Sequence, residues 1–257
     1  MRLIVTRPAA QAAAWVASLQ GLGCQAQALP LIDIVPVPDA APLQAAWQAL
    51  GQYGLVMFVS ANAVEQFFAA APGGMAWPVG VRAGSTGPGT SAALRRAGVR
   101  ESDLVEPSPD APSYDSEGLW ARVSHEPWDG RRVLVVRGED GRDWLADTLR
   151  SQGADVDFVA AYRRQAPAWA AAERAVVQQA LAAPADHLWV FSSSEAVRHL
   201  QGAMPQADWS RSMAVATHAR IAEAARSLGF GQVRLVAPDV QALASLAAAG
   251  PSIQFEP

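Results

Sequence analysis

Lysine is missing from this chain, because all 20 basic residues among its 257 are arginine. Schiff-base chemistry, pyridoxal phosphate catalysis and the Walker-type phosphate loop each need a lysine and are therefore excluded. Cysteine occurs once, as Cys24, which excludes a disulfide within the chain and a cysteine-based metal site. The catalytic patterns GxSxG and HExxH do not occur, and the histidines do not have metal-ligand spacing, so no metal is expected.

Long apolar runs are missing as well. About half of the residues are apolar (51%), yet no stretch reaches the roughly 18–20 apolar residues of a membrane span. Arg7 and Pro8 stand where a signal peptide would need its apolar centre, which predicts a cytoplasmic protein without a membrane partner. The formal net charge is −4 and no basic cluster occurs, so nucleic acid is not expected as a partner either.

What the chain does contain is an internal duplication. Residues 132–164 predict a strand, a helix closed by Gly153 and a second strand, since two apolar runs flank a helical pattern. Residues 2–34 repeat this pattern without a gap, so that Arg7 matches Arg137. The chain therefore carries two copies of one strand–helix–strand unit.

A second unit is also present twice, in residues 55–123 and 188–250. LVMFVSANAVEQF in the first copy matches LWVFSSSEAVRHL in the second, with Ser60 on Ser193. Strands that alternate with helices imply right-handed crossovers and a parallel sheet covered by helices on both faces. The fold class is therefore α/β, with two similar domains that each hold a five-stranded parallel sheet.

The domain boundaries can be drawn in two ways. The breaks of low complexity are residues 35–42, 124–131 and 165–170. A tandem arrangement would divide the chain at the middle break. A swapped arrangement would divide it at the two proline-rich breaks, so that residues 1–36 and 168–257 enclose residues 37–167. We favour the swapped arrangement, because proline linkers are stiff and extended and these two breaks follow equivalent strands.

Ligands of doubly wound sheets bind at the carboxyl ends of the strands. These ends carry small, hydroxylated or arginine residues, most of them just before a predicted helix, whose N-terminus is suited to an anion. Ser60 and Ser193 would equally serve as N-caps, and Arg7 and Arg137 as surface ion pairs. The candidate substrate contacts are Thr6, Arg7, Ser60, Ala61, Asn62, Gly89, Thr90, Arg137, Gly138, Glu139, Ser192, Ser193, Ser194, Thr217 and His218.

The glycine-rich stretch AGSTGPGT, residues 83–90, resembles a dinucleotide-binding loop in its place between a strand and a helix. Its spacing is GxxGxG rather than GxGxxG, and Pro88 lacks an N–H donor. A tight strand–helix turn is favoured, and a nucleotide-dependent enzyme is the weaker alternative.

Several motifs follow one another in a fixed order: VTRP, FVSANAV, STGPGTSAAL, LVVRGEDGRDWLADTL, VDFVAAYRR and WVFSSSEAV. In these motifs, and over essentially its full length, the chain resembles the uroporphyrinogen-III synthase family. The resemblance implies two flavodoxin-like domains joined by two linkers, the first formed from both ends of the chain. It therefore supports the swapped arrangement.

The resemblance also implies a reaction: a cofactor-free lyase that closes hydroxymethylbilane, a linear tetrapyrrole with eight carboxylates. The last pyrrole ring is inverted and water is lost, which gives uroporphyrinogen III in a cleft between the domains. The family tyrosine corresponds to Tyr162, as a catalytic proton donor to the departing hydroxyl, with aromatic packing as its alternative role. THARI, residues 217–221, replaces the glycine-rich turn of the family, so no catalytic threonine is carried over.

Two further expectations concern partners. The chain is expected to be a monomer, and a transient contact with the preceding enzyme of the pathway stays open. The alternative function is a non-catalytic cytoplasmic module that binds a small tetrapyrrole-like anion, since a binding protein would need the same architecture.

Overall fold

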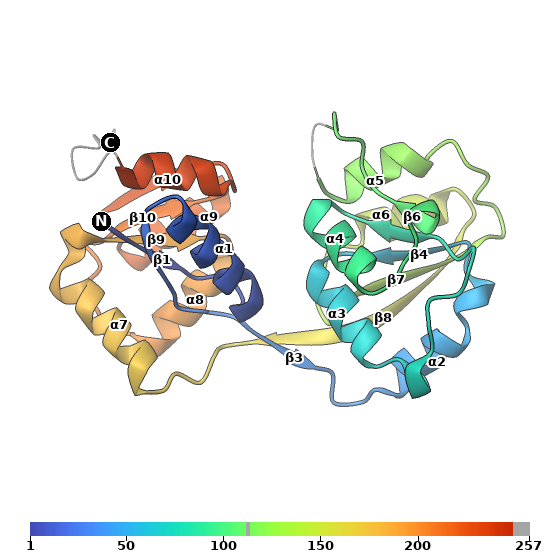
Figure 1. Ribbon diagram of the computed structural model, residues 1–257, viewed down its shortest axis with the longest axis horizontal. Coiled ribbons are helices and arrows are strands. Elements are labelled where there is room, and N and C mark those ends of the chain that lie inside the picture. The colour runs from blue at the N-terminus through green and yellow to red at the C-terminus, as the bar shows by residue number, and fades with distance from the viewer. Residues whose placement is uncertain (112–113, 249–257) are drawn as a thin grey trace. The chain divides into compact units, whose positions relative to one another are not determined.

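The computed structural model describes residues 1–111 and 114–248. The chain forms two compact units, shown in Figure 1. Unit 1 consists of Met1–Asp33 with Gln165–Pro257, and unit 2 consists of Ile34–Arg164. No helix in these described ranges combines the length and the apolar character that crossing a bilayer requires.

The sheet of unit 1 has five strands in the order β11-β10-β9-β1-β2, with parallel neighbours throughout. The strands are β1 (Arg2–Val5), β2 (Gln25–Ala28), β9 (His187–Phe191), β10 (Met213–Ala216) and β11 (Gln232–Leu235). Strands β1, β9 and β10 are the central three, and almost every one of their side chains is buried. Burial on both faces explains why these segments are continuously apolar.

Helices cover both faces of this sheet (Figure 1). They are α1 (Ala9–Gly21), α7 (Ala171–Ala182), α8 (Ser194–Ala203), α9 (Ala219–Leu228) and α10 (Val240–Ala248), with a 3-10 turn at Pro184–Asp186. On one face, Leu3 and Val190 pack with Leu19 of α1 and Leu243 of α10. On the other, Trp189 packs edge-on against Trp209, with the ring centres 5.4 Å apart.

The sheet of unit 2 has the order β3-β8-β7-β4-β5-β6. The strands are β3 (Asp33–Pro36), β4 (Leu55–Phe58), β5 (Ala83–Ser85), β6 (Leu104–Val105), β7 (Arg132–Gly138) and β8 (Asp155–Gln165). The prediction of five strands was wrong here by one, because β3 adds a sixth. β8 is long, and its free edge is paired by the extended residues of β3.

The two sheets share one strand order. By the duplication, β1 and β2 correspond to β7 and β8, and β9, β10 and β11 correspond to β4, β5 and β6. Both sheets then have the order 2-1-3-4-5 of flavodoxin-like folds, although unit 2 uses the two halves in the opposite order along the chain. The predicted α/β class and the duplication are confirmed.

Unit 2 is also covered on both faces. Its helices are α2 (Ala41–Gln48), α3 (Ala61–Ala69), α4 (Pro88–Arg96), α5 (Ser116–Val123) and α6 (Trp144–Ser151), with 3-10 turns at Leu50–Gln52, Pro72–Gly74 and Glu101–Asp103. Phe58 and Val136 pack with Trp47 and Phe67 under α2 and α3. Alternate strand residues such as Met57 face the other side and pack with α5 and α6.

Candidate functional site

Predicted site residues from distant parts of the chain meet at the carboxyl ends of the strands of unit 2. Ser60 lies two residues beyond the end of β4, and Arg137 and Gly138 end the neighbouring strand β7. Tyr162 lies on β8, where its backbone is paired with that of Gly138. The backbone N–H of Glu139 donates to the carbonyl oxygen of Tyr162 at 3.1 Å, which fixes the end of β7 against β8.

Tyr162 has a packed ring and a hydroxyl with polar neighbours. The residue is 1% exposed and belongs to the core under α2 and α3. Its Oη lies 3.2 Å from the Oγ of Ser60. The Nη2 of Arg164 donates to the same Oη at 3.4 Å, and this guanidinium lies 5.8 Å from the ring centre. Packing and hydrogen bonding therefore fix both ends of this side chain.

A pocket of about 300 Å³ opens beside this tyrosine. Its wall includes Tyr162 and Arg164 of β8, Arg137 of β7, Arg142, and Asp115 and Ser116 at the start of α5. Three arginines therefore share this wall with two acids, Asp115 and Asp140. The guanidinium groups are the part of the wall that is suited to a carboxylate ligand, since they donate strong hydrogen bonds to carboxylates.

Two of the pocket arginines also contact acids of the protein. Arg137 forms an ion pair with Asp143, and its Cζ lies 4.8 Å from the centre of the Phe158 ring. Arg142 forms an ion pair with Glu117 on α5. The surface-ion-pair role weighed for Arg137 from the sequence is therefore present. A substrate carboxylate would have to share Arg137 with Asp143 or displace it.

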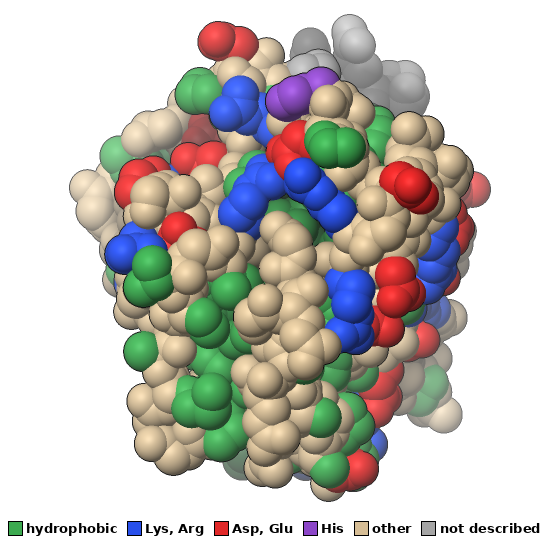
Figure 2. Space-filling model, turned by 90° about the vertical axis from the view of Figure 1, so that its right-hand side faces the viewer, with side chains coloured by type: hydrophobic (Ala, Val, Ile, Leu, Met, Phe, Trp, Pro, Cys, Tyr) green, Lys and Arg blue, Asp and Glu red, His purple; other side chains and the backbone are tan. Residues whose placement is uncertain are grey.

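Elsewhere on unit 2, arginines and acids lie side by side at the surface, as Figure 2 shows for one face. Arg82 donates two hydrogen bonds to Glu126, at 2.6 and 2.9 Å, and Arg131 adds an ion pair with the same carboxylate. The Arg82 hydrogen bonds lower the pKa of Glu126 and outweigh the effect of burial, which raises it. These groups stabilise the fold of the unit.

The other predicted contacts of unit 2 lie in the first turns of α3 and α4. Ala61 and Asn62 begin α3, and Asn62 is buried. Gly89 and Thr90 follow Pro88 in the first turn of α4, and Thr90 is buried. The glycine-rich stretch forms the tight turn into α4. A hydrogen bond between the hydroxyls of Ser85 and Ser91, 2.6 Å apart, stabilises this turn.

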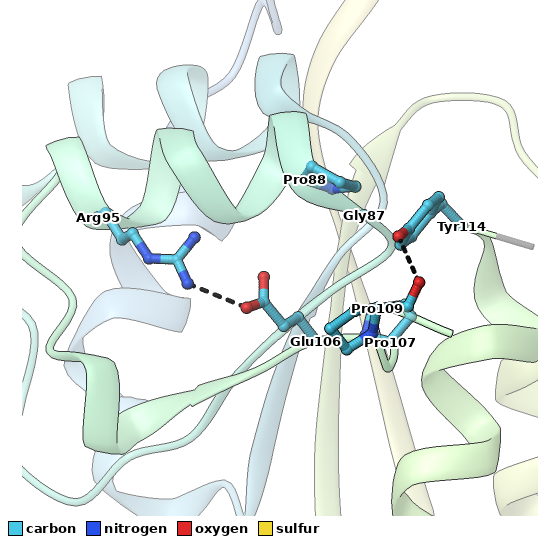
Figure 3. A pocket seen from close by; sticks show the side chains of 7 residues that line it. All are labelled: Gly87, Pro88, Arg95, Glu106, Pro107, Pro109 and Tyr114. Carbon is cyan, nitrogen blue, oxygen red and sulfur yellow. Dashed lines mark hydrogen bonds and ion pairs between the residues drawn. The ribbon is translucent and has the colours of Figure 1, made fainter. Parts of the chain in front are cut away.

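A second pocket, of about 220 Å³, lies next to this turn and is shown in Figure 3. Its polar side chains point toward protein partners rather than into the space. Arg95 donates to Glu106 at 3.0 Å and to Glu101 at 2.7 Å, and Tyr114 donates to the carbonyl oxygen of Pro109 at 3.1 Å. This pocket therefore presents little that could orient a ligand.

In unit 1 the predicted contacts meet at the carboxyl ends of the adjacent strands β1, β9 and β10. The hydroxyl of Thr6 donates to the carbonyl oxygen of Val190 at 2.7 Å and is buried. Ser193 caps α8 by accepting from the N–H of Glu195 at 3.1 Å. His218 caps α9, since its Nδ1 accepts from the N–H of Arg220 at 3.2 Å.

The remaining contacts of unit 1 lie beside these caps. Ser192 precedes the cap of α8, and the hydroxyl of Ser194 donates to the carbonyl oxygen of Arg220 at 3.4 Å. The N–H of Thr217 donates to the carbonyl oxygen of Phe191 at 3.2 Å. The turn that replaces the glycine-rich turn of the family therefore joins β10 to α9 through a histidine cap.

Arg7 is held differently from Arg137, its counterpart in the duplication. Its Cζ lies 4.0 Å from the centre of the Trp15 ring, and its Nη1 donates to the Oε1 of Gln11 at 3.4 Å. Its Nε is buried without a hydrogen-bond partner, and burial lowers the pKa of this guanidinium. A carboxylate ligand would supply the charge partner that Trp15 and Gln11 do not.

Sequence reasoning missed several groups of the pocket beside Tyr162. Arg164 had a usable signal, because residues two apart on a strand face the same side and Arg164 follows Tyr162 at that spacing. Asp115 had one in the pattern DSEGL, since its carboxylate accepts from the N–H of Gly118 at 2.9 Å as the N-cap of α5. No sequence signal pointed to Arg142, because its place on the pocket wall depends on how α5 and α6 pack.

Comparisons with known proteins point to one family. A family profile described as uroporphyrinogen-III synthase HemD matches residues 13–246. The uroporphyrinogen-III synthase of Salmonella typhimurium is 30% identical over 244 residues, which is 91% of this chain and 94% of that protein. The enzyme of the same name from Escherichia coli is 29% identical with the same coverage.

Solved structures with the same fold carry the same name. Uroporphyrinogen-III synthetase from Helicobacter pylori aligns over 97% of this chain and 99% of its own, with a TM-score of 0.58 at 15% identity. A mutant uroporphyrinogen III synthase from Thermus thermophilus aligns over 97% of this chain and 98% of its own, with a TM-score of 0.55 at 17% identity. At these identities the likeness concerns the fold, and it agrees with the two flavodoxin-like sheets.

Proposed function

This chain belongs to the uroporphyrinogen-III synthase family, and we propose that it has the activity of that name. It would cyclise hydroxymethylbilane, invert the last pyrrole ring and release water to give uroporphyrinogen III. The observation that carries this proposal is the 30% identity to the Salmonella typhimurium enzyme over 91% of this chain. The arginine-lined pocket beside Tyr162 supports it, because the substrate carries eight carboxylates.

The chemistry starts when the terminal hydroxyl leaves and produces an azafulvene cation. This cation reacts at the substituted carbon of the last ring, and the resulting spiro intermediate fragments and recloses. Because the bilane closes spontaneously to the type I isomer, the task of the protein is to control conformation and exclude water. We propose that Tyr162 gives its phenolic proton to the departing hydroxyl. Its buried ring and its contact with Arg164 support that role.

Carboxylates of the substrate would be held by arginines and by the first turns of helices. Arg137, Arg142 and Arg164 line the pocket of unit 2, and Arg7 presents a guanidinium in unit 1. The helices α3, α4, α8 and α9 begin at the carboxyl ends of their strands, where free N–H groups attract anions.

We also propose the swapped domain arrangement, with residues 1–36 and 168–257 forming one domain and 37–167 the other. The two compact units, which divide the chain near the same positions, support it. The protein is further proposed to act in the cytoplasm as a monomer and without a cofactor.

The test is an isomer assay. The protein is incubated with freshly prepared hydroxymethylbilane, the products are oxidised, and the type I and type III porphyrins are separated. A reaction without protein supplies the spontaneous type I background. We expect mainly type III in the presence of the protein. Type I alone, together with measurable binding of the bilane, would instead identify a non-catalytic binding module.

A further inference from the structure

The side chain of Tyr162 crosses a neighbouring strand. Tyr162 belongs to β8 and Ser60 follows β4, and β7 lies between these two strands in the sheet. The two hydroxyls are nevertheless only 3.2 Å apart. The crossing takes place at Gly138 of β7, which is paired with Tyr162.

Gly138 permits this crossing because it has no side chain. A Cβ at this position would lie 3.0 Å from the Cε2 and 3.1 Å from the Cζ of the Tyr162 ring. Real Cβ atoms rarely come that close to a neighbour, and the ring is packed and cannot move away easily. The end of β7 is thus shaped to bring the tyrosine hydroxyl to Ser60.

We propose that Ser60 is a positioning residue, which holds the Tyr162 hydroxyl as the proton donor of the reaction. This inference rests on the proposed function. It assigns Ser60 a role different from the substrate contact expected from the sequence. Ser60 acts through Tyr162 and needs no contact with the bilane.

The N-cap bond of Ser60 leaves its hydroxyl hydrogen available, and the proposed role has this hydrogen donated to Tyr162. The Oγ of Ser60 accepts from the N–H of Ala63 at 3.2 Å, as the N-cap of α3, so its own hydrogen can be donated to the Oη of Tyr162. In the proposed arrangement Ser60 donates to this oxygen together with Arg164, which leaves the phenolic hydrogen for a substrate in the adjoining pocket.

The same arrangement stabilises the charge that proton transfer creates. When Tyr162 gives its proton, the C–O bond of the bilane breaks, water leaves and a phenolate remains. The hydrogen bonds from Ser60 and Arg164 and the positive end of the α3 dipole all favour negative charge on that oxygen. The last pyrrole loses a proton as the macrocycle closes, which balances the proton that Tyr162 gave, so the net loss is one water.

The duplication provides an internal comparison. Ser193 occupies the place of Ser60 in the other copy and caps α8, although it accepts from the N–H two positions on and Ser60 from the N–H three positions on. The position equivalent to Tyr162 is Ile32 there, so no phenol lies at the corresponding place. Capping alone explains Ser193, whereas Ser60 has a second contact that the cap does not require.

Three substitutions at Ser60 separate positioning from capping. Ser60→Ala removes both the cap and the donor, Ser60→Thr keeps both, and Ser60→Asp keeps a good cap but replaces the donor by an anion. We expect kcat for the type III product to fall about 10-fold or more in Ser60→Ala, with KM unchanged, because one hydrogen bond to a developing charge is lost. Ser60→Thr should restore most of the rate.

Ser60→Asp is the decisive variant. It should unfold at the wild-type temperature or above and still lose at least as much kcat as Ser60→Ala. Wild-type turnover in Ser60→Asp would overturn the proposal. It would also be overturned if kcat of the three Ser60 variants simply followed their unfolding temperatures.

A double-mutant cycle with Tyr162→Phe completes the test, since residues that act as a unit are not additive. In the Tyr162→Phe background, Ser60→Ala should lower kcat by less than about 2-fold. An undiminished effect there would overturn the positioning role while wild-type formation of type III leaves the proposed function standing. If wild type itself yields only type I, both the function and this inference are overturned.

Discussion

At the scale of single residues, Tyr162 is constrained at both its ring and its hydroxyl. Its ring is enclosed by the core of unit 2, and its hydroxyl contacts Ser60 and Arg164. Packing alone does not require a hydroxyl at this position, because Ile32 is buried at the equivalent position of unit 1. The contacts of the hydroxyl therefore favour the chemical role over the packing role.

Tyr162→Phe tests that role directly. The ring stays and only the hydroxyl is lost, so we expect the fold and the affinity for the bilane to be kept. Turnover should fall by about 10²-fold or less, near the lower limit of general acid catalysis, because the leaving hydroxyl ionises easily. The product should shift toward type I as spontaneous closure competes. Turnover and isomer ratio are measured together, and unchanged values in a folded variant would return Tyr162 to packing.

Arg7 and Arg137 are predicted to hold substrate carboxylates. Replacing either by alanine should mainly raise KM, by about 10-fold, because such contacts stabilise the ground state and the transition state alike. Arg7→Ala should have the larger effect, since Arg137 also pairs with Asp143 whereas Arg7 stacks on Trp15. Steady-state kinetics of both variants give the answer, and wild-type KM in both would assign these residues to structural contacts.

Sequence reasoning reached Tyr162 and Ser60 separately but could not join them. The two residues belong to different repeat units, and their contact depends on strand order and on the side chain that Gly138 lacks. The prediction that Ser60 and Ser193 serve as N-caps is confirmed, because a cap depends on residues only two or three positions away. Local contacts could be predicted, whereas contacts across strands could not.

At the scale of elements, a network of hydrogen bonds links the amino-terminal parts of β7 and β8 to the segment before β4. Arg132 at the start of β7 donates to Asp157 of β8 at 2.6 Å, and Tyr53 before β4 donates to the same carboxylate at 2.9 Å. Burial and the hydrogen bond to Asp157 raise the pKa of Tyr53 to about 12. This network lies at the amino ends of the strands, opposite Ser60 and Tyr162, so it stabilises the sheet without entering the site.

The carboxylate of Glu126 offers a stability test at this scale, because Arg82 and Arg131 connect it to the segments before β5 and β7. A lowered pKa in the folded state contributes stability above the ordinary value of 4.5, and this contribution is lost as pH falls through the lowered value. Glu126→Gln should therefore cost about 1 kcal/mol at neutral pH. The difference in free energy of unfolding between this variant and wild type should shrink well below pH 4.5, as measured by urea unfolding.

Glu101→Gln is the matched control for this prediction. Both glutamates accept two hydrogen bonds from one arginine, but the Glu126 side chain is 17% exposed and that of Glu101 is 70% exposed. Because water and salt screen the exposed pair, Glu101→Gln should leave the free energy of unfolding unchanged. Equal losses in the two variants would show that burial is not what gives the Glu126 pair its effect.

Strand β3 is the element that the sequence does not predict. The first repeat unit ends at residue 34 and a proline-rich break begins at residue 35, so residues 33–36 straddle this boundary and no separate strand is expected there. The structure pairs them with β8, which extends to Gln165 and offers an edge to pair with. Whether an edge strand forms depends on that distant partner, and its own four residues carry no sign of it.

At the scale of the whole molecule, the duplication explains why so much of the architecture could be predicted. Each repeat fixes strands and helices by apolar periodicity, and two matching copies confirm one another. The two units have the same order of five corresponding strands, although the two-strand half comes first along the chain in unit 1 and second in unit 2. Strand order therefore follows from how the two halves pack together rather than from which half comes first along the chain.

This independence of chain order predicts that unit 2 folds alone. Residues 34–164 contain both core clusters of the second sheet, from Leu43 to Tyr162 on one face and from Leu55 to Val156 on the other. A fragment of this size can bury about two-thirds of its unfolded surface, which is sufficient for a stable domain. We expect the excised fragment to show an α/β circular dichroism spectrum and one cooperative thermal transition.

Leu149→Ala supplies the control for that experiment. Leu149 of α6 is fully buried within the fragment, so its truncation should destabilise the fragment by about 2–5 kcal/mol, as expected for a packed core leucine. A fragment with native-like packing must respond to this change with a lower midpoint of unfolding. A fragment that unfolds without cooperativity, or that ignores the substitution, would show that unit 2 depends on residues outside 34–164 for its core.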